Sequence, residues 1–171
     1  MGYLQEKLQD VAALPADRPM GMPGTFYTSQ EQFDYEARTV LRSGWHCLGR
    51  EDEIPEMGDF FTAQLLNEPL LVVRGEEGIV RVMANVCRHR GMPLAEGKGN
   101  TKRFVCSYHA WTYGHDGALL RAPRMQHAGF DAKGCKLPEH KVQLWNGFIY
   151  VTLDPNEPAF EHPELDALLS P

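Results

Sequence analysis

A chain of 171 residues is long enough for one domain with a hydrophobic core and some additional structure. Its net charge of −6 argues against a nucleic-acid partner. No apolar run approaches the roughly eighteen residues of a membrane-spanning helix, and the N-terminal MGYLQEKLQD lacks the apolar core of a secretory signal. We therefore expect a cytoplasmic protein without a membrane segment. Its cysteines should stay reduced and serve as ligands or buried thiols rather than form disulfides.

The first 44 residues read as a helical arm. Apolar residues at helical spacing predict a short amphipathic helix near the N-terminus, and three prolines between residues 15 and 23 predict an extended connection. A second helix is expected from Ser29, where Gln32 completes a capping-box pattern, to Gly44. Its expected buried face consists of Phe33, Ala37, Val40 and Leu41.

After Gly44, β-prone runs bounded by turn residues replace the helical patterns. The expected strands are WHCLG at 45–49, GDFFTAQLL at 58–66, PLLVVRG at 69–75, IVRVMA at 79–84, Phe104-Val105, WTY at 111–113, ALL at 118–120 and GFIYVTL at 147–153. The end of the chain is acidic and rich in proline, with a possible helix starting near Pro163. We therefore predict a mainly β protein of small antiparallel sheets behind the arm, with boundaries at 1–44, 45–155 and 156–171.

The strongest chemical signal is a pair of mixed motifs, Cys87-x-His89 and Cys106-x-x-His109. A binuclear iron–sulfur cluster held between two loops explains the mixture, since each iron needs two protein ligands besides its bridging sulfides. Cys87 and Cys106 would bind one iron, and His89 and His109 the other. A mononuclear Cys2His2 zinc site is the alternative, although its motifs normally pair cysteine with cysteine. Four unrelated residues are the other alternative.

The residues around these motifs resemble those of a Rieske domain: CRHRG at 87–91, CSYHAW at 106–111, Tyr113 and the glycine at 117. More narrowly, the chain resembles the N-terminal half of the α subunit of Rieske non-haem iron oxygenases, both the ring-hydroxylating and the choline- and carnitine-type enzymes. The likeness covers roughly residues 26 to 153. Two positions depart from the usual pattern, Ser107 where proline is common and Ala110 where glycine is common.

The resemblance implies one 2Fe-2S cluster per chain, reduced by a reductase or ferredoxin. The cluster would pass electrons to a mononuclear Fe(II) in the catalytic domain of the same or a neighbouring subunit, where an organic substrate is hydroxylated or demethylated. That iron would lie only in a domain missing from this chain, so no catalytic residue is expected here, and 156–171 would begin the linker toward that domain. The full-length protein would be a homo-oligomer, a trimer. The alternative is a stand-alone Rieske ferredoxin with no reaction of its own.

The remaining candidates are weaker. Cys47 and Cys135 are interpreted as buried or incidental thiols. Residues 85–125 contain seven Lys or Arg and two acids, a net charge of +5. This region, with Arg88 and Arg90 beside His89, suggests a docking surface for an acidic electron-transfer partner, with a solvated loop as the alternative. The other histidines share no metal-ligand spacing and are interpreted as ordinary polar groups: His46, His115, His127, His140 and His162.

Overall fold

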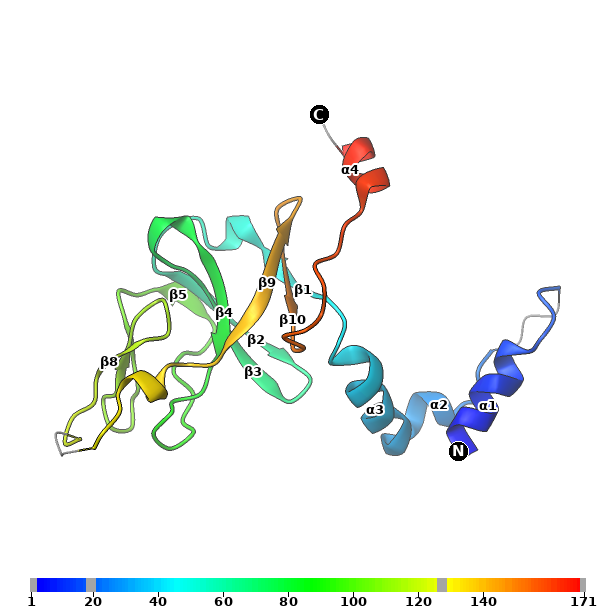
Figure 1. Cartoon of the computed structure of the whole chain (residues 1–171), viewed down its shortest axis with the longest axis horizontal. Coiled ribbons are helices and arrows are strands. Elements are labelled where there is room, and N and C mark those ends of the chain that lie inside the picture. The colour runs from blue at the N-terminus through cyan, green and yellow to red at the C-terminus, as the bar shows by residue number, and fades with distance from the viewer. Residues whose placement is uncertain (1–2, 18–20, 126–128, 170–171) are drawn as a thin grey trace. The chain divides into compact units, whose positions relative to one another are not determined.

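The computed structural model describes residues 3–17, 21–125 and 129–169. The chain divides into two compact units, residues 1–42 and residues 43–171 (Figure 1). Within the described residues, no helix is long and apolar enough to cross a membrane. The first unit contains α1 (Tyr3–Ala12), α2 (Thr25–Thr28), α3 (Gln30–Glu36) and the π-helical turn η1 (Ala37–Leu41).

The helix predicted from Ser29 is present, but its predicted buried face is wrong. The Ser29 hydroxyl caps α3 by accepting the Gln32 backbone N–H at 3.3 Å, and the buried Gln32 side chain donates to Glu36. Phe33 is 44% exposed and Val40 is 59% exposed. A π-helical turn contains more residues than an α-helical one, so side chains from residue 37 onward leave the face that a period of 3.6 predicts.

The second unit consists mainly of two antiparallel sheets, which confirms the mainly β prediction. The larger sheet has the order β1-β10-β9-β4-β3-β2-β5, and the smaller sheet has the order β6-β7-β8. Three single-turn helices precede strands of the large sheet: η2 (Glu51–Glu53) before β2, η3 (Glu76–Gly78) before β4 and η4 (Lys133–Cys135) before β9. The last helix, α4 (Pro163–Leu169), begins at the predicted proline. The strands are β1 (His46–Arg50), β2 (Asp59–Leu65), β3 (Glu68–Arg74), β4 (Val80–Ala84), β5 (Lys98–Asn100), β6 (Phe104–Val105), β7 (Thr112–Tyr113), β8 (Leu119–Arg121), β9 (Glu139–Trp145) and β10 (Phe148–Thr152).

Strand β3 is buried on both faces and separates two hydrophobic cores. Leu70 and Val72 face a core that includes Ile149 of β10, whereas Leu71 and Val73 face a second core. Alternate side chains of a strand point to opposite faces, so one continuous apolar run supplies both cores. The second core also contains Cys87, Phe104, Cys106, Trp111, Tyr113 and Leu137.

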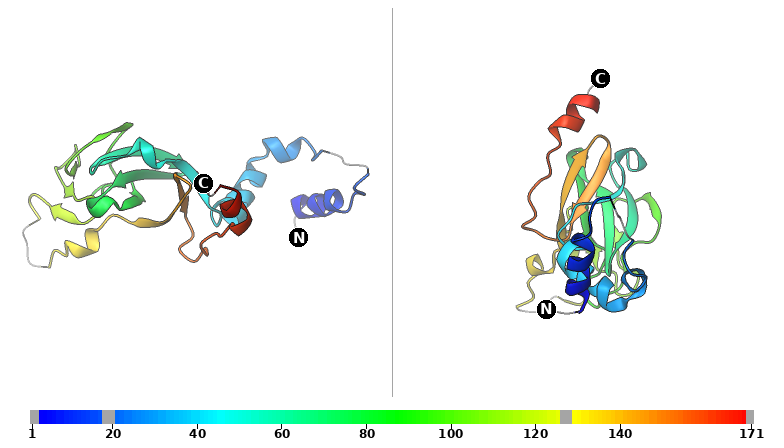
Figure 2. Two further views of the ribbon diagram at one scale, coloured as in Figure 1. Left: turned by 90° about the horizontal axis from the view of Figure 1, so that it is seen from above. Right: turned by 90° about the vertical axis from the view of Figure 1, so that its right-hand side faces the viewer.

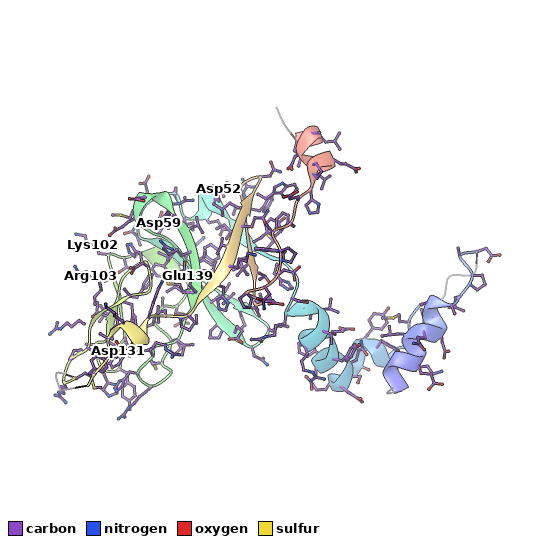
Figure 3. The ribbon with its side chains drawn as sticks, viewed as in Figure 1. Asp52, Asp59, Lys102, Arg103, Asp131 and Glu139 are labelled. Atoms are coloured by element: carbon purple, nitrogen blue, oxygen red, sulfur yellow. The ribbon has the colours of Figure 1, made fainter. Side chains whose placement is uncertain are left out.

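The small sheet and its loops lie at one end of this unit, and the β9–β10 hairpin lies toward the other (Figures 1 and 2). Lys102 and Arg103, between β5 and β6, are exposed at that first end, whereas Glu139 lies on β9 (Figure 3). The second core therefore joins the large sheet to the two loops that carry the mixed Cys/His motifs.

Candidate metal centre

The first motif lies in a loop after β4 that is closed by two backbone hydrogen bonds around its cysteine. The Cys87 N–H donates to the Met92 carbonyl at 2.8 Å, and the Cys87 carbonyl accepts the Gly91 N–H at 2.9 Å. Gly91 has a φ of +72°, the left-handed conformation that glycine adopts without a steric penalty. The loop thus doubles back on itself and presents the residues between Cys87 and Gly91 at its tip.

The second motif lies in a loop between β6 and β7 with the same two bonds. The Cys106 N–H donates to the Trp111 carbonyl at 2.8 Å, and the Cys106 carbonyl accepts the Ala110 N–H at 2.9 Å. Ala110 has a φ of +56°. The two cysteines therefore hold equivalent positions in two copies of one loop, although the motifs around them differ in spacing.

The histidines break this equivalence, because His89 follows its cysteine by two residues and His109 follows its cysteine by three. Their rings nevertheless meet, with centroids 4.6 Å apart and planes at 76°. Cys87 and Cys106 are 2% and 3% exposed and belong to the second core. The structure thus brings the two histidine rings together and buries the two cysteines in the same core.

The inner nitrogens of both histidines are suited to bind a metal group. His89 Nδ1 and His109 Nδ1 are buried and have no hydrogen-bond partner among the described residues. Leaving a buried polar atom unpaired costs about 1–3 kcal/mol, so two such neighbours need an explanation. Two imidazole nitrogens and two buried thiols, one of each from each loop, make up the donor set of a cluster with mixed Cys/His ligation. The residues therefore fit a 2Fe-2S cluster.

A single-metal arrangement fits less well. In the described part of the chain, no three His, Cys, Asp or Glu side chains are grouped as a mononuclear site requires. A zinc ion takes about four donors directed at one point. Two irons bridged by sulfides need only two protein donors each, which favours the binuclear interpretation over the zinc alternative.

The surroundings of His109 favour the neutral form that a metal ligand needs. Burial, followed by the positive charges of His89, Arg90 and Arg124, lowers the pKa of His109 below its ordinary value. His89 and His109 are only half-buried, and Arg88 and Arg90 beside them are exposed.

Each histidine ring lies against an aromatic side chain. His89 stacks on Trp111, with centroids 4.8 Å apart and planes within 8° of parallel. Trp111 is 3% exposed and also contacts Phe130. The ring centroid of His109 lies 3.8 Å from that of Tyr108, which is 58% exposed. Trp111 therefore packs against His89 from the protein interior, and the exposed Tyr108 packs against His109.

Tyr113 connects the second core to the first loop. Its hydroxyl accepts the Arg88 backbone N–H at 3.0 Å and lies 3.4 Å from Cys87 Sγ. Burial, followed by the contact with Cys87, raises the pKa of Tyr113 above its ordinary value, so the phenol stays protonated and can donate to the sulfur.

Asn85 is a structural residue that the sequence analysis did not identify. Its buried side chain accepts the backbone N–H groups of Leu94 and Ala95 at 3.0 and 3.1 Å and donates to the Ala95 carbonyl at 2.8 Å. These bonds hold the end of the first loop against β4. A polar residue directly after an apolar strand was the only signal for this role.

The other cysteines and histidines lie outside this cluster. Cys47 is exposed on β1, Cys135 is half-buried in η4, and both are free thiols. His115 bonds to the Thr101 carbonyl at 2.8 Å, and His162 contacts aromatic rings near the C-terminus. His46 and His140 are half-buried in β1 and β9. His127 lies outside the described residues.

Comparison with known families decides between these interpretations. The family described as the Rieske [2Fe-2S] domain matches residues 44–145. The chain belongs to the Rieske [2Fe-2S] domain family. This confirms the resemblance carried by residues 87–91 and 106–111, and makes a 2Fe-2S cluster the cofactor of the domain.

Curated relatives confirm the narrower resemblance as well. The chain is 32% identical over 163 residues to the carnitine monooxygenase oxygenase subunit of Acinetobacter baumannii, covering 94% of this chain and 44% of the relative. It is 39% identical over 146 residues to the glycine betaine monooxygenase oxygenase subunit of Pseudomonas aeruginosa, covering 85% of this chain and 34% of the relative. The chain thus spans less than half the length of these oxygenase subunits.

Solved structures share the fold over the same region. The quaternary ammonium Rieske monooxygenase CntA in complex with gamma-butyrobetaine superposes with a TM-score of 0.82 at 31% identity, covering 88% of this chain and 44% of that one. Naphthalene 1,2-dioxygenase from Rhodococcus sp. gives a TM-score of 0.80 at 31% identity, covering 98% of this chain and 37% of that one. The Rieske domain here is therefore similar to those of both monooxygenases and dioxygenases.

Proposed function

We propose that this Rieske domain carries electrons within an oxygenase component, from a reductase or ferredoxin to a mononuclear non-haem iron. The observation that supports the proposal is that the two Cys/His loops of a Rieske fold each carry a buried thiol and an unpartnered imidazole nitrogen, and that the two imidazole rings meet. The matched curated relatives are oxygenase subunits along 85–94% of this chain, which does not favour a stand-alone ferredoxin.

Cys87, Cys106, His89 and His109 are the proposed ligands, the cysteines on one iron and the histidines on the other. The group they would hold supplies one-electron redox chemistry. The thiolates and neutral imidazoles bind it, Trp111 and Tyr108 orient the rings, and the second core keeps water away from the sulfurs. The outer edges of both histidines reach the surface, where an electron can enter or leave.

The remaining parts of the proposal concern the whole protein. Residues 1–44 are proposed as an arm, 45–155 as the Rieske domain and 156–171 as the start of a linker toward a catalytic domain. That domain would hold the mononuclear Fe(II), in the same or a neighbouring subunit of a trimer. A cytoplasmic location is part of this proposal. Because carnitine, glycine betaine and choline monooxygenases are among the relatives, a small quaternary amine is the first substrate class to test.

The test starts with the purified chain, which should contain about two irons and two acid-labile sulfides and should be red-brown. It should accept electrons from a reductase and return them to oxygen or another acceptor. It should form no product from carnitine, glycine betaine, choline or naphthalene when given reductant and oxygen. A colourless chain holding one zinc would overturn the assignment of a 2Fe-2S cluster. Product formation by this chain alone would overturn the proposal that substrate is oxidised in a separate catalytic domain.

A further inference from the structure

The outer face of the β1-β10-β9 part of the sheet carries large aromatic side chains. Trp145 lies on β9, Tyr150 lies on β10, and Trp45 directly precedes β1. Ile149 and Val151, their neighbours on β10, point the other way into the first core. A half-buried sheet normally presents polar side chains on its solvent face, so a face with three aromatic rings indicates a surface that something covers.

The chain's own segment after β10 lies on this face. We define residues 156–162, between β10 and α4, as the strap. After β10 the chain turns back and runs beside the β9–β10 hairpin toward α4 (Figures 1 and 2). Along β9, Lys141 contacts Glu157, Gln143 contacts Phe160, and Trp145 contacts His162. The strap therefore runs parallel to β9, over the face of the sheet rather than along its edge.

Phe160 is the central contact of the strap. Its ring centroid lies 4.9 Å from that of Tyr150, 5.5 Å from Trp45 and 6.1 Å from Trp145, all in edge-to-face arrangements. Such ring pairs contribute about 0.5–1.5 kcal/mol each beyond the burial of apolar area. One side chain of the strap thus meets all three aromatic residues of the sheet face.

Side chains of the sheet also bind the strap's backbone. The Gln143 amide pairs with both backbone groups of Phe160, donating to its carbonyl at 2.7 Å and accepting its N–H at 3.0 Å. The Trp45 indole N–H donates to the Pro158 carbonyl at 2.8 Å, and the Lys141 ammonium donates to the Glu157 carbonyl. These bonds give hydrogen-bond partners to backbone groups of the strap that have none within a helix or strand. A linker that moves freely would instead form these bonds with water.

We propose that this aromatic face is a peptide-binding surface whose occupant is the strap, anchored by Phe160 and aligned by Gln143. The strap fixes the direction in which the chain leaves the Rieske domain and holds α4 beside Trp145, whose indole N–H donates to Asp166 at 2.6 Å. The segment proposed as the start of a linker is therefore docked. This inference goes beyond the proposed function, because it involves no cluster ligand and holds with or without electron transfer.

Hydrogen exchange of the full chain, followed by mass spectrometry, tests the proposal. In the parent chain, amides of the strap, residues 156–162, should exchange roughly tenfold or more slowly than in a free peptide of the same sequence. Phe160→Ala should remove most of that protection, and Gln143→Ala should remove part of it. Leu168→Ala is the matched control, since Leu168 is 79% exposed on the same tail, and it should exchange like the parent.

Two further readouts keep the result unambiguous. Slow exchange of β3 and β4 in every variant shows that the domain is still folded. Tryptophan emission should shift to longer wavelength in Phe160→Ala but not in Leu168→Ala, since two of the three tryptophans contact Phe160. Unprotected exchange of the strap in the parent, or unchanged exchange in Phe160→Ala, would overturn the proposal without affecting the cluster assignment.

Discussion

Gly91 and Ala110 hold the same place in the two loops: each donates its backbone N–H to the carbonyl of the cysteine four residues earlier, and each has a positive φ. Glycine adopts this conformation readily, whereas alanine has a Cβ that crowds its own backbone. The second loop therefore carries a local strain that the first loop lacks, at the position where the sequence departs from the common glycine.

The first prediction is that Ala110→Gly stabilises the folded chain. Relief of the left-handed strain should exceed the extra entropy that glycine loses on folding, for a net gain of about 0.5–1 kcal/mol in the free energy of unfolding. Urea unfolding followed by circular dichroism measures this difference. Iron content should not change, because residue 110 is not a proposed ligand.

Two variants serve as controls for this prediction. Gly91→Ala should destabilise the chain by about 1–2 kcal/mol, and only through its backbone, since an added methyl group would meet no atom within 4 Å. Ala132→Gly, at an ordinary φ of −66°, should destabilise slightly. Equal destabilisation by Ala110→Gly and Ala132→Gly would show that the loop is unstrained.

The second prediction separates the proposed ligands from the other thiols. Cys87→Ser or Cys106→Ser should lose the iron and sulfide and lower the stability of the β unit, because cluster binding and folding are linked. Cys47→Ser should keep about two irons per chain, since Cys47 is exposed on β1 far from the loops in the sequence. Iron analysis and visible absorption check both. Full iron content in Cys87→Ser would remove that residue from the ligand set.

The sequence predicted most strands and both Cys/His loops because these features are encoded locally. GFIYVTL forms β10, and the two mixed motifs lie in turns as expected. Strands β5 and β9 were missed. Lys98–Asn100 has little β propensity and is held as a strand by pairing with β2. Strand β9 mixes charged, polar and apolar residues, and its polar side chain Gln143 binds the strap rather than solvent, so the sequence of β9 shows no clear strand pattern.

Features that depend on contacts distant in sequence could not be predicted. The two loops have different Cys–His spacings, so their common backbone arrangement is invisible until their hydrogen bonds are known. The predicted burial of Val40 failed because residues 37–41 form a π-helical turn, which changes the spacing of the side chains. The role of Phe160 depends on its contacts with Trp45, Trp145 and Tyr150, which are far from it or from one another in the sequence.

The third prediction concerns the hydroxyl of Tyr113 beside Cys87. A donor to the cysteine sulfur stabilises the more negative, reduced state, so Tyr113→Phe should lower the reduction potential. If the bond strengthens by about 1 kcal/mol on reduction, the shift is roughly 40 mV for one electron. Spectroelectrochemical titration measures it. Tyr27→Phe, in the first unit and 73% exposed, is the control and should leave the potential unchanged.

The fourth prediction tests the basic surface around the histidines. If Arg88 and Arg90 attract an acidic electron donor, the rate of reduction should fall as salt concentration rises. Arg88→Glu or Arg90→Glu should slow reduction several-fold at low salt and leave iron content unchanged. Arg38→Glu makes the same charge change in the first unit and should have little effect. Rates that do not respond to salt would support a solvated loop without a docking role.

The last prediction concerns the strand that connects the two ligand loops. Asp59 lies on β2 (Figure 3). It is paired with Asn100 of β5, and its carboxylate accepts the Asn100 side-chain N–H and the Glu56 backbone N–H, both at 2.8 Å. The bond from Asn100, followed by that from Glu56, lowers the pKa of Asp59 below its ordinary value. A carboxyl group with a lower pKa in the folded state stabilises that state above the unfolded pKa of about 3.9.

This contribution is lost as the pH falls through the lowered folded pKa. The difference in unfolding free energy between the parent and Asp59→Asn should therefore be constant above about pH 5 and shrink below about pH 4. Urea unfolding at a series of pH values gives this difference. Glu77→Gln removes the same charge from the exposed turn η3 and serves as the control for the change in net charge. If the difference for Asp59→Asn were independent of pH, its carboxylate would not be what holds β5 to β2.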